Sequence, residues 1–521
     1  MPAAAGLVAC PEMLCCRIRP ARPFSVQTAS PRRTKEVIFM RTVEALSGGE
    51  WVTTGDWIDV HDPADVRAPI ARVPALAAKD VTRAYDHAER AFAVWKRTSP
   101  FERARILTDA ARLIRDRVEE IAADVTAENG KTLTEATGET LKAADFLEYY
   151  AGLARQGYGT LLHDVRPNHR THTQREPIGV ILVISPWNDP LITPARKLAP
   201  LLAAGNAAVF KPATETPLAG LHFARALHDA GLPAGVLNVV TGRTAEIEEA
   251  LLDDPRIVGI TFTGSNAVGG RIRRRLADRN VRFQGELGGK NASVVLKDAD
   301  LPAAAKAVVA ASFGQAGQRC TATSRVVVEQ PVYEEFARLL VAEVEALKIG
   351  PGSDPTTTLC PLSSPRQRDS VLADVDKAVE QGAVVLTGGT ADTEGERAHG
   401  CYVRPTVLGD VTPETAIWRE EVFGPVLAVR VVDDFAAAVD AVNDSDFGLA
   451  AAVFTRDLAC AYRFADEAEC GQVAVNTTTT GWDVHLPFGG FRDSGTAYKE
   501  QGDEVLRFST RVKTVAVHFG A

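Results

Sequence analysis

The stretch Ile178-Gly179-Val180-Ile181-Leu182-Val183-Ile184 decides the fold prediction for this sequence. A continuous apolar run is typical of a strand in a parallel sheet, where both faces are buried. Helical and strand patterns then alternate, with strands expected at 207–210, 236–240 and 257–262 and helices at 191–204, 217–230, 245–253 and 267–277. This alternation predicts a doubly wound α/β domain of the kind that binds nucleotides.

A second α/β pattern extends from residue 291 to about residue 491. Its clearest elements are strands at 293–296 and 325–328 and helices at 303–313 and 332–347. Ahead of residue 178, apolar residues at three- and four-residue spacing predict helices at 84–115, 118–129 and 133–158, the second ending at Gly130. The alternating residues 510–517 predict an exposed edge strand, which favours pairing with another subunit.

Composition restricts the class of protein. The chain has 521 residues, of which 45% are hydrophobic and 24% charged, as in soluble globular proteins of two or three domains. The net charge of −9 argues against nucleic acid as a partner, and no apolar run reaches the roughly 20 residues of a membrane helix. The basic run 271–275 favours a solvated helix face over an anion site.

Cysteine usage indicates the compartment. The eight cysteines form no CxxC pair and no regular spacing, so we predict neither a zinc site nor a disulfide framework and expect a reducing, cytoplasmic location. Residues 1–39 differ in composition, with several arginines and few acids. They are compatible with an organelle presequence, with a disordered extension, or with translation that begins at Met40; we favour the disordered extension.

Two glycine-flanked reactive groups stand out in the chain. Cys320 follows Gly314-Gln315-Ala316-Gly317-Gln318-Arg319, and Glu286 precedes Leu287-Gly288-Gly289. A lone cysteine is usually a packing residue. A carboxylate with similar surroundings changes this expectation, because a nucleophilic thiol needs a base and an acyl-enzyme needs an activated water.

The ends of the predicted strands carry polar segments, at 185–190, 211–217, 262–269 and 286–289. Ligands of doubly wound sheets bind at this edge. Lys211 can meet a ribose or phosphate, and Gly264-Ser265 opens a helix whose amides can receive a pyrophosphate, although the fingerprint GxGxxG is absent. The amide of Asn188 suits an oxyanion and suits a turn equally well.

Seven motifs occur in an order and with gaps that resemble the aldehyde dehydrogenase superfamily. They are Pro-Trp-Asn-x-Pro (186–190), Lys-Pro-Ala (211–213), Phe-Thr-Gly-Ser (262–265), Glu-Leu-Gly-Gly-Lys (286–290), Gly-Gln-x-Cys (317–320), Glu-Glu-Val-Phe-Gly-Pro (420–425) and Pro-Phe-Gly-Gly-Phe (487–491). The match covers roughly residues 45–518. The resemblance implies NAD(P)-dependent oxidation of an aldehyde to the carboxylic acid through a cysteine thiohemiacetal and a thioester.

The resemblance also implies catalytic roles for five residues. Cys320 is the expected nucleophile, and Asn188 with the Cys320 amide would stabilise the oxyanion. Glu286 would activate the water that hydrolyses the thioester. Lys197 and Glu500 match positions proposed to pass the proton onward.

The expected cofactor is NAD or NADP, and the metal content is expected to be none. Glu421 matches the contact to the nicotinamide ribose and Phe423 the contact to its ring. Thr214 stands where NAD-preferring members often carry a glutamate, so a 2′-phosphate would not be repelled and NADP would be tolerated. The expected cofactor contacts are Ile184, Pro186, Trp187, Lys211, Thr214, Gly264, Ser265, Gly288, Glu421 and Phe423.

Departures from the family pattern concern the substrate, which we expect to be a polar aldehyde or a semialdehyde. Asp189 replaces the usual aromatic residue after Asn188. Arg196 stands where acid-semialdehyde members can place a carboxylate-binding arginine, but an ion pair within the structure, for example with Asp189, explains it equally well. Arg319 precedes the nucleophile, and Gly314 stands where such enzymes can carry a second arginine. Trp482, in the loop 477–485, is expected at the substrate entrance.

The family resemblance further implies a domain division and an assembly. Residues 40–158 and 178–288 would form a Rossmann-type NAD(P)-binding domain and 289–493 an α/β catalytic domain. Residues 159–177 and 508–518 would form a small β oligomerisation element of a homodimer or homotetramer. The expected partner is a small-molecule aldehyde, with no nucleic acid and no membrane.

Three other functions would place different demands on these residues. In a coenzyme-A-acylating dehydrogenase a carboxylate base is dispensable, so Glu286 argues against it. A cysteine thioesterase or esterase, with His485 as its histidine, would leave Lys211 and Gly264-Ser265 without a purpose. A non-catalytic relative would have lost reactive residues, yet Cys320 and its expected partners are present.

Overall fold

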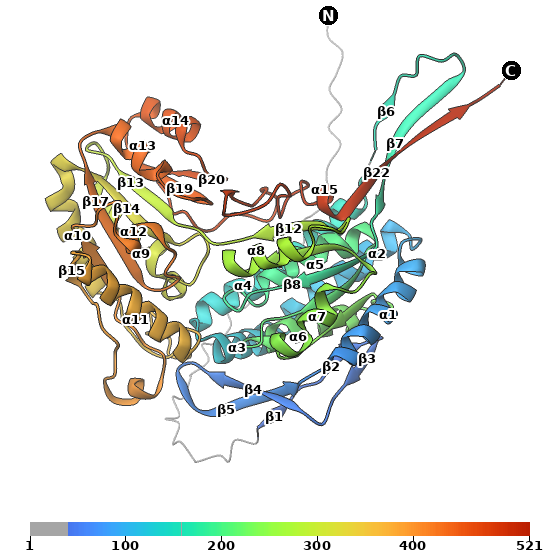
Figure 1. The fold of residues 1–521 in the computed structure, drawn as a ribbon, viewed down its shortest axis with the longest axis horizontal. Helices are drawn as coiled ribbons and strands as arrows, with labels where there is room; N and C mark the ends of the chain where they lie inside the picture. Colours follow the sequence, from blue (N-terminus) through green and yellow to red (C-terminus); the bar gives the residue numbers. More distant parts are fainter. Residues whose placement is uncertain (1–39, 158, 521) are drawn as a thin grey trace, which may run out of the picture. The chain divides into compact units, whose positions relative to one another are not determined.

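The computed structural model describes residues 40–157 and 159–520, so the extension expected at residues 1–39 lies outside the described part. Within residues 40–520, Figure 1 shows two sheets flanked by helices and a β-ribbon that extends from one of them. None of the helices in the described ranges has both the length and the apolar character needed to cross a membrane.

The first sheet has five parallel strands in the order β10-β9-β8-β11-β12. Their bounds are β8 Val180–Ile184, β9 Ala207–Lys211, β10 Leu237–Val239, β11 Ile257–Thr263 and β12 Arg282–Glu286. The apolar run lies in β8, at the centre of the sheet, which confirms the predicted burial. The order reverses between β8 and β11, and a parallel sheet binds ligands at such a switch point.

Helices cover both faces of this sheet because alternate residues of a strand point to opposite faces. Ile181 and Val183 of β8 pack in one core with α2, α4, α5 and α6, whereas Val180 and Leu182 pack in another with α1, α7 and α8. The helix bounds are α1 Ala78–Trp95, α2 Pro100–Asp116, α3 Val118–Asn129, α4 Leu133–Ala154, α5 Ile192–Ala204, α6 Pro217–Asp229, α7 Thr244–Leu252 and α8 Asn266–Arg275.

The prediction of a single helix over 84–115 is wrong. Two helices occupy this stretch, and α2 begins at Pro100, which cannot continue α1 because it lacks an amide hydrogen. Ser99 caps α2 by accepting a hydrogen bond from the Phe101 amide at 3.3 Å. Helix α3 ends as predicted at Gly130, which has a φ of 92°. Helix α4 ends at Ala154, earlier than expected.

The second sheet has seven strands in the order β15-β16-β17-β14-β13-β19-β20, parallel except for the pair β15–β16. The strand bounds are β13 Asn291–Val295, β14 Thr323–Glu329, β15 Val384–Thr387, β16 Thr406–Gly409, β17 Val426–Val432, β19 Ala450–Phe454 and β20 Gln472–Val475. The helix bounds are α9 Leu301–Phe313, α10 Tyr333–Glu345, α11 Pro365–Glu380, α12 Ala416–Arg419, α13 Phe435–Asn443 and α14 Leu458–Glu467. A separate apolar core lies within this unit.

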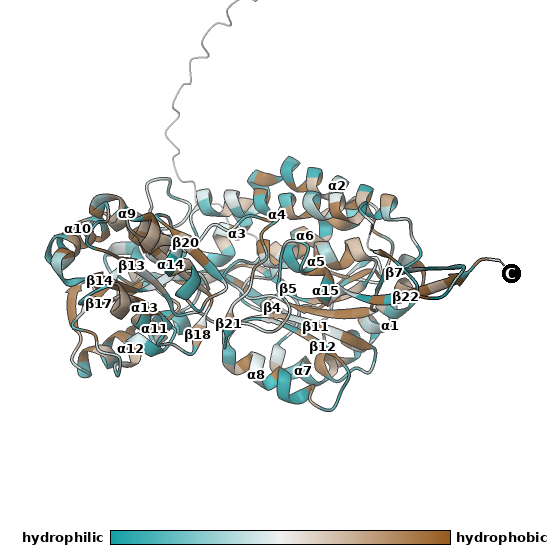
Figure 2. Ribbon diagram, turned by 90° about the horizontal axis from the view of Figure 1, so that it is seen from above, coloured by the Kyte–Doolittle hydropathy of each residue, from teal (hydrophilic) through white to brown (hydrophobic). Residues whose placement is uncertain are grey.

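The β-ribbon is a three-stranded antiparallel sheet in the order β22-β7-β6. Its strands are β6 Leu161–Leu162, β7 His169–Pro177 and β22 Thr510–His518. Figures 1 and 2 both show it extending away from the two larger sheets. Apolar side chains on it are exposed, including Leu161 and Val512 at 71% and 56%. The edge strand predicted at 510–517 is therefore present, and it pairs with β7.

Smaller elements complete the fold. Strands β1 Arg41–Thr42, β5 Asp65–Pro74 and β4 Trp57–Asp62 form one sheet, β2 Ala45–Ser47 pairs with β3 Glu50–Val52, and β18 Phe447–Gly448 pairs with β21 Phe491–Arg492. The short helices are α15 Leu506–Ser509 and the 3-10 turns η1 Gly314–Gly317, η2 Gln330–Val332 and η3 Gly395–His399.

Candidate active site

Cys320 stands just beyond the tight turn that follows helix α9. Gln315 and Ala316 have φ values of 52° and 53°, and Gly317 has a φ of 72°. A Cβ on Gly317 would lie 2.2 Å from the carbonyl oxygen of Gly424, so only glycine fits between the two segments. The glycine spacing before the cysteine therefore reflects a left-handed turn packed against the Glu420–Pro425 motif.

Two cavities meet at Cys320. One, of about 530 Å3, is lined by residues of α4, the turn η1 and the loop with Trp482. The other, of about 280 Å3, is lined by Asn188, Gly288, Glu421 and Phe423. A third cavity of about 340 Å3 shares Trp187 and Gly264 with the second and continues to Lys211 and Thr214. The three form a series, so a thiol stands between a pocket for a small molecule and a cleft long enough for a dinucleotide.

Two glycines bring the Glu286 segment against the cysteine. A Cβ on Gly289 would lie 2.5 Å from the carbonyl oxygen of Cys320, and one on Gly288 would lie 2.6 Å from Glu421 Oε2. Asn291 Nδ2 also donates to the Cys320 carbonyl oxygen, at 2.7 Å. Glu286 and Cys320, 34 positions apart in the sequence, are thus brought into one site by direct backbone contact.

Asn188 lies on the other side of the cysteine turn. Its Nδ2 donates to the carbonyl oxygen of Gln318 at 2.9 Å, and its own carbonyl oxygen accepts from Lys131 Nζ at 2.8 Å. Lys131 forms a buried ion pair with Glu139 at 2.5 Å, and Glu139 Oε1 accepts from the amide of Leu191 at 2.8 Å. Both side chains of this pair hold the loop that carries Asn188.

Lys131 and Glu139 are positions that the sequence analysis missed. The only signal was a lysine directly after the helix end at Gly130, and an isolated lysine at a helix end is normally a surface residue. Lys131 is buried in the tertiary structure because it contacts Glu139 of α4 and the loop that precedes α5.

Glu286, Lys197 and Glu500 come together in one buried chain of contacts. Lys197 Nζ lies 2.5 Å from Glu500 Oε1 and donates to Gln284 Oε1 at 3.2 Å. Gln284 Nε2 donates to Glu286 Oε1 at 2.9 Å. Among the described residues, Glu286 Oε2 has no hydrogen-bond partner. The carboxylate is therefore held by one oxygen and has the other available.

Burial determines the protonation of the reactive groups. It raises the pKa of the Cys320 thiol to about 12, against the opposing effect of the Arg196 guanidinium. Burial and the neighbouring Glu500 raise the pKa of Glu286 well above its usual value, while burial lowers the pKa of Lys197. The thiol must lose its proton before it attacks a carbonyl, and a carboxylate with a raised pKa suits the activation of a water.

The cleft beyond Asn188 has the polar groups that a dinucleotide needs. The hydroxyl oxygens of Ser185 and Thr263 are buried without a hydrogen-bond partner among the described residues, and both line the 340 Å3 cavity. Gly264 and Ser265 stand at the start of α8, where backbone amides are free to bind phosphate. Lys211 Nζ donates to Pro212 O at 2.9 Å and to Thr214 Oγ1 at 3.1 Å. These residues fit NAD or NADP.

The nicotinamide end of the cleft also fits the cofactor. Glu421 Oε1 accepts from the Gly289 amide at 2.8 Å, and burial raises the pKa of Glu421 to about 7. Phe423 has a φ of 56°, rare for a bulky residue, and its ring meets Trp187 edge-on at 5.3 Å. Ile184 and Pro186 line the neighbouring 340 Å3 cavity.

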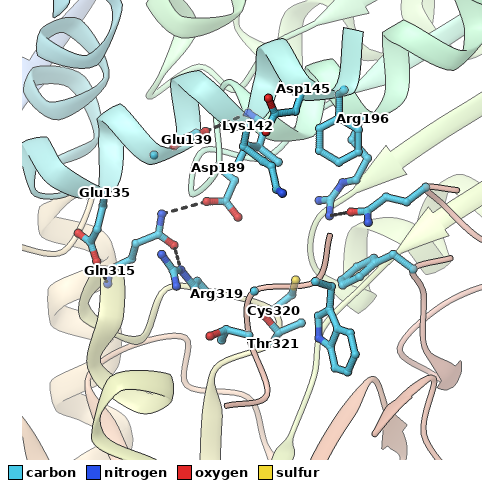
Figure 3. Close-up of a pocket in the computed structure, with 18 of the residues that line it drawn as sticks. Glu135, Glu139, Lys142, Asp145, Asp189, Arg196, Gln315, Arg319, Cys320 and Thr321 are labelled. Atoms are coloured by element: carbon cyan, nitrogen blue, oxygen red, sulfur yellow. Dashed lines mark hydrogen bonds between the residues drawn. The ribbon is translucent and has the colours of Figure 1, made fainter. Parts of the chain in front are cut away.

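The 530 Å3 cavity carries charged side chains around the cysteine (Figure 3). Gln315 Nε2 donates to Asp189 Oδ1 at 3.0 Å, and Gln315 Oε1 accepts from Arg319 Nε. Arg319 forms no ion pair with a carboxylate in the described part of the chain. Lys131 lies 3.3 Å from Asp189 and compensates its charge.

The Arg196 guanidinium contacts Glu500 and Gln501. Its Nε lies 2.7 Å from Glu500 Oε2 and its Nη1 donates to Gln501 Oε1 at 3.1 Å. The ion pair considered from the sequence exists, but its partner is Glu500 rather than Asp189. Trp482 lines the cavity and donates through Nε1 to Thr479 O at 2.9 Å. Among the described residues, His485 does not line either cavity at Cys320.

The fold and the site are those of a nicotinamide-dependent dehydrogenase with a cysteine where two cavities meet. Comparison with known proteins makes the assignment specific: the model of the aldehyde dehydrogenase family matches residues 51–515. The chain is 40% identical over 471 residues to alpha-ketoglutaric semialdehyde dehydrogenase of Bacillus subtilis, covering 90% of this chain and 96% of the relative. It is 42% identical to alpha-ketoglutarate semialdehyde dehydrogenase of Haloferax volcanii, covering 90% and 97%.

Solved structures agree with these relatives. An NADP-dependent enzyme of E. coli superposes with a TM-score of 0.88 at 34% identity, covering 92% of this chain and 99% of that one. Betaine aldehyde dehydrogenase of Staphylococcus aureus, solved with NAD+, superposes with a TM-score of 0.89 at 30% identity, covering 92% and 95%. The chain belongs to the aldehyde dehydrogenase family, and it is an NAD(P)-dependent enzyme that oxidises an aldehyde to the carboxylic acid. The resemblance inferred from the seven motifs is confirmed.

Proposed function

We propose that the substrate is a semialdehyde with a carboxylate at its far end, of the 2-oxoglutarate semialdehyde type. One observation carries this proposal. Arg319 directly precedes the nucleophile, lines the 530 Å3 cavity, and pairs with no carboxylate of the described chain. A guanidinium binds a planar carboxylate through two parallel hydrogen bonds, which suits an α-keto acid.

The orientation of Arg319 supports this role. Gln315 holds only its Nε, and Gln315 is itself fixed by Asp189 and by Glu135 Oε1, which accepts from the Gln315 amide at 2.7 Å. The terminal nitrogen Nη1 lies 3.6 Å from the point where a Cβ on Gly314 would be. Arg319 therefore occupies the side of the cavity where semialdehyde enzymes can carry an arginine at residue 314.

Arg196 is the weaker candidate for binding the carboxylate. Its guanidinium already contacts Glu500 and Gln501, and its charge sits 4.9 Å above the ring of Phe488. We propose that Arg196 balances the charge of Glu500. The names of the two relatives described above agree with a keto-acid semialdehyde as substrate.

We propose the following roles for the reactive residues. Cys320 attacks the aldehyde carbon as a thiolate after its thiol proton has passed to water in the cavity, and Asn188 Nδ2 with the Cys320 amide binds the thiohemiacetal oxyanion. Glu421 and Phe423 would hold the nicotinamide, which would supply the acceptor for the hydride. Glu286 then takes a proton from water as it attacks the thioester, and Lys197 and Glu500 carry that proton away from the site.

Resolution of the thioester by coenzyme A would require no such base, so formation of acyl-coenzyme A on adding coenzyme A would contradict the proposal.

For the nicotinamide coenzyme, we propose that NADP is tolerated beside NAD. Thr214 accepts a hydrogen bond from Lys211 Nζ at 3.1 Å where a glutamate would place a carboxylate beside that ammonium, so residue 214 itself does not repel a 2′-phosphate.

We also propose an assembly and a location. The exposed strand β22 and the apolar side chains of the β-ribbon suit a homodimer or homotetramer in which residues 159–177 and 508–518 form the contact. We also propose that residues 40–158 and 178–288 form the cofactor domain and residues 289–493 the catalytic domain. The cysteines at 320, 360, 401, 460 and 470 are all free, which suits a reducing cytoplasm.

The substrate is tested with aldehydes of equal length, with and without a terminal carboxylate, assayed with both coenzymes. For the parent we expect 2-oxoglutarate semialdehyde and succinic semialdehyde to be preferred over neutral and aromatic aldehydes. In Arg319→Met, kcat/KM for the acidic substrates should fall by about 100-fold, while that for neutral aldehydes stays within about threefold. An equal loss for both kinds of aldehyde would contradict carboxylate binding by Arg319.

A further inference from the structure

Glu286 is tied to the Lys197–Glu500 pair by a residue outside the seven motifs, Gln284. Gln284 and Glu286 lie two residues apart on β12, so their side chains point to the same face of the sheet. The parallel register places Thr261 of β11 directly beside Gln284. Sheet geometry alone therefore gathers these three side chains, and helix α5 adds Lys197 above them.

Both the nitrogen and the oxygen of the Gln284 side-chain amide form hydrogen bonds. Its nitrogen donates to Glu286 Oε1 at 2.9 Å, and its oxygen accepts from Lys197 Nζ at 3.2 Å and from the Thr261 hydroxyl. Gln284 is 1% exposed and Thr261 2% exposed, so no water competes for these contacts. The orientation of the amide is unambiguous, because a carboxylate oxygen can only accept and an ammonium can only donate.

We propose that Gln284 is a positioning residue that holds the Glu286 carboxylate in place for hydrolysis of the thioester and keeps the Lys197 ammonium away from it. The inference rests on the proposed role of Glu286 as the base. It explains why a cation and a carboxylate in one buried cluster are bridged by an amide: a direct ion pair would stabilise the carboxylate and make it a weaker base.

The contacts of Lys197 support this separation. Its three N–H groups are directed to Thr261 Oγ1 at 2.9 Å, to Gln284 Oε1 and to Glu500 Oε1. No further donor is left for Glu286. The second carboxylate oxygen, Oε2, is the one without a partner, and it is therefore the oxygen that can receive the proton of a water.

The experiment compares Gln284→Met, which keeps the size and removes both hydrogen bonds, with Gln284→Glu, which adds a second carboxylate. Rapid mixing measures the first turnover as a burst of reduced coenzyme, and steady-state assays give kcat against pH. In Gln284→Met the burst should remain and the steady rate should fall by about tenfold, the equivalent of about 1.4 kcal/mol for a hydrogen bond to a charged group.

The pH profile separates positioning from a general structural defect. The charged or titratable groups that face Glu286 are Glu500, Lys197, Arg196, Lys499 and the thiol of Cys320. Because Thr261 and Glu500 still hold Lys197 Nζ in Gln284→Met, loss of the amide donor should move the acidic limb of kcat to higher pH. In Gln284→Glu, where an added anion also opposes ionisation of Glu286, the limb should move further.

Two outcomes would overturn the inference: an acidic limb that stays in place in both variants, or a burst that is lost together with turnover. Glu286→Gln distinguishes this failure from failure of the proposed role. If Glu286→Gln hydrolyses the thioester at the parent rate, Glu286 is not the base; if it is slow while both Gln284 variants match the parent, only the inference on Gln284 fails.

Discussion

Gly289 packs directly on the carbonyl oxygen of Cys320, so closely that a Cβ on the glycine would lie 2.5 Å from that oxygen. The contact joins the loop after β12 to the turn after α9 and sets where the nucleophile stands. Gly289→Ala should therefore displace the Cys320 backbone and its oxyanion-binding amide. We expect kcat to fall by about 100-fold or more, with a loss of stability of about 1–3 kcal/mol from overpacking.

A suitable control is Gly152→Ala, because a Cβ on this glycine of α4 meets nothing within 4 Å. Gly138 of the same helix is equally open but lines the 530 Å3 cavity, so it does not serve as a control for kcat. Gly152→Ala should leave kcat unchanged and match or slightly exceed the parent in melting temperature, since alanine favours helix. Parent activity in Gly289→Ala would show that the contact does not position Cys320.

Glu286→Gln tests the base and its pH dependence. The raised pKa of Glu286 means that the carboxyl is protonated at low pH and cannot accept a proton, so kcat of the parent should rise with pH along a limb well above the usual carboxyl range. In Glu286→Gln this limb should disappear, with a rapid burst of reduced coenzyme and slow turnover after it. Stopped-flow absorbance measures both phases. Turnover at the parent rate would mean that another base hydrolyses the thioester.

Lys131→Met tests the buried ion pair beneath Asn188. Lys131 is 0% exposed, and its removal leaves the Glu139 carboxylate without its cation, which typically costs about 3–5 kcal/mol. Chemical denaturation should show this loss. Lys142→Met is the matched control, because Lys142 pairs with Asp483 at the surface, where an ion pair contributes about 0–1 kcal/mol. Equal stability of the two variants would contradict the proposed bracing of the loop.

Thr214→Glu tests coenzyme selection. A carboxylate beside Lys211 would repel a 2′-phosphate, so the Kd of NADP should rise by at least about tenfold, while that of NAD stays the same or falls. Titration calorimetry on the Cys320→Ala protein measures binding without turnover. Equal effects on both coenzymes would place the 2′-phosphate elsewhere in the cleft.

The sequence predicted much of this arrangement because the relevant signals are local. The apolar run of β8 and the alternation after it predicted the parallel sheet, and the glycines around Glu286 and Cys320 pointed to two segments in close contact. The sequence pattern predicts one helix where α1 and α2 lie, because the apolar periodicity continues past the end of α1, although Pro100 marks the start of α2. Gln284 and Lys131 could not be recognised, since an isolated glutamine in a strand and a lysine at a helix end are ordinary surface patterns.

By itself, the sequence determined the class of fold and the family, because these depend on residue types at fixed spacing along the chain, and it predicts Cys320 as the nucleophile. Only the tertiary structure decided which of two arginines near Cys320 forms an ion pair within the described part of the chain. Arg196 and Arg319 both line the 530 Å3 cavity, but packing of α5 against the C-terminal segment pairs Arg196 with Glu500, whereas Arg319 forms no ion pair with a carboxylate of the described residues. Such pairing depends on distances between segments far apart in the chain, and local patterns carry no information about these distances.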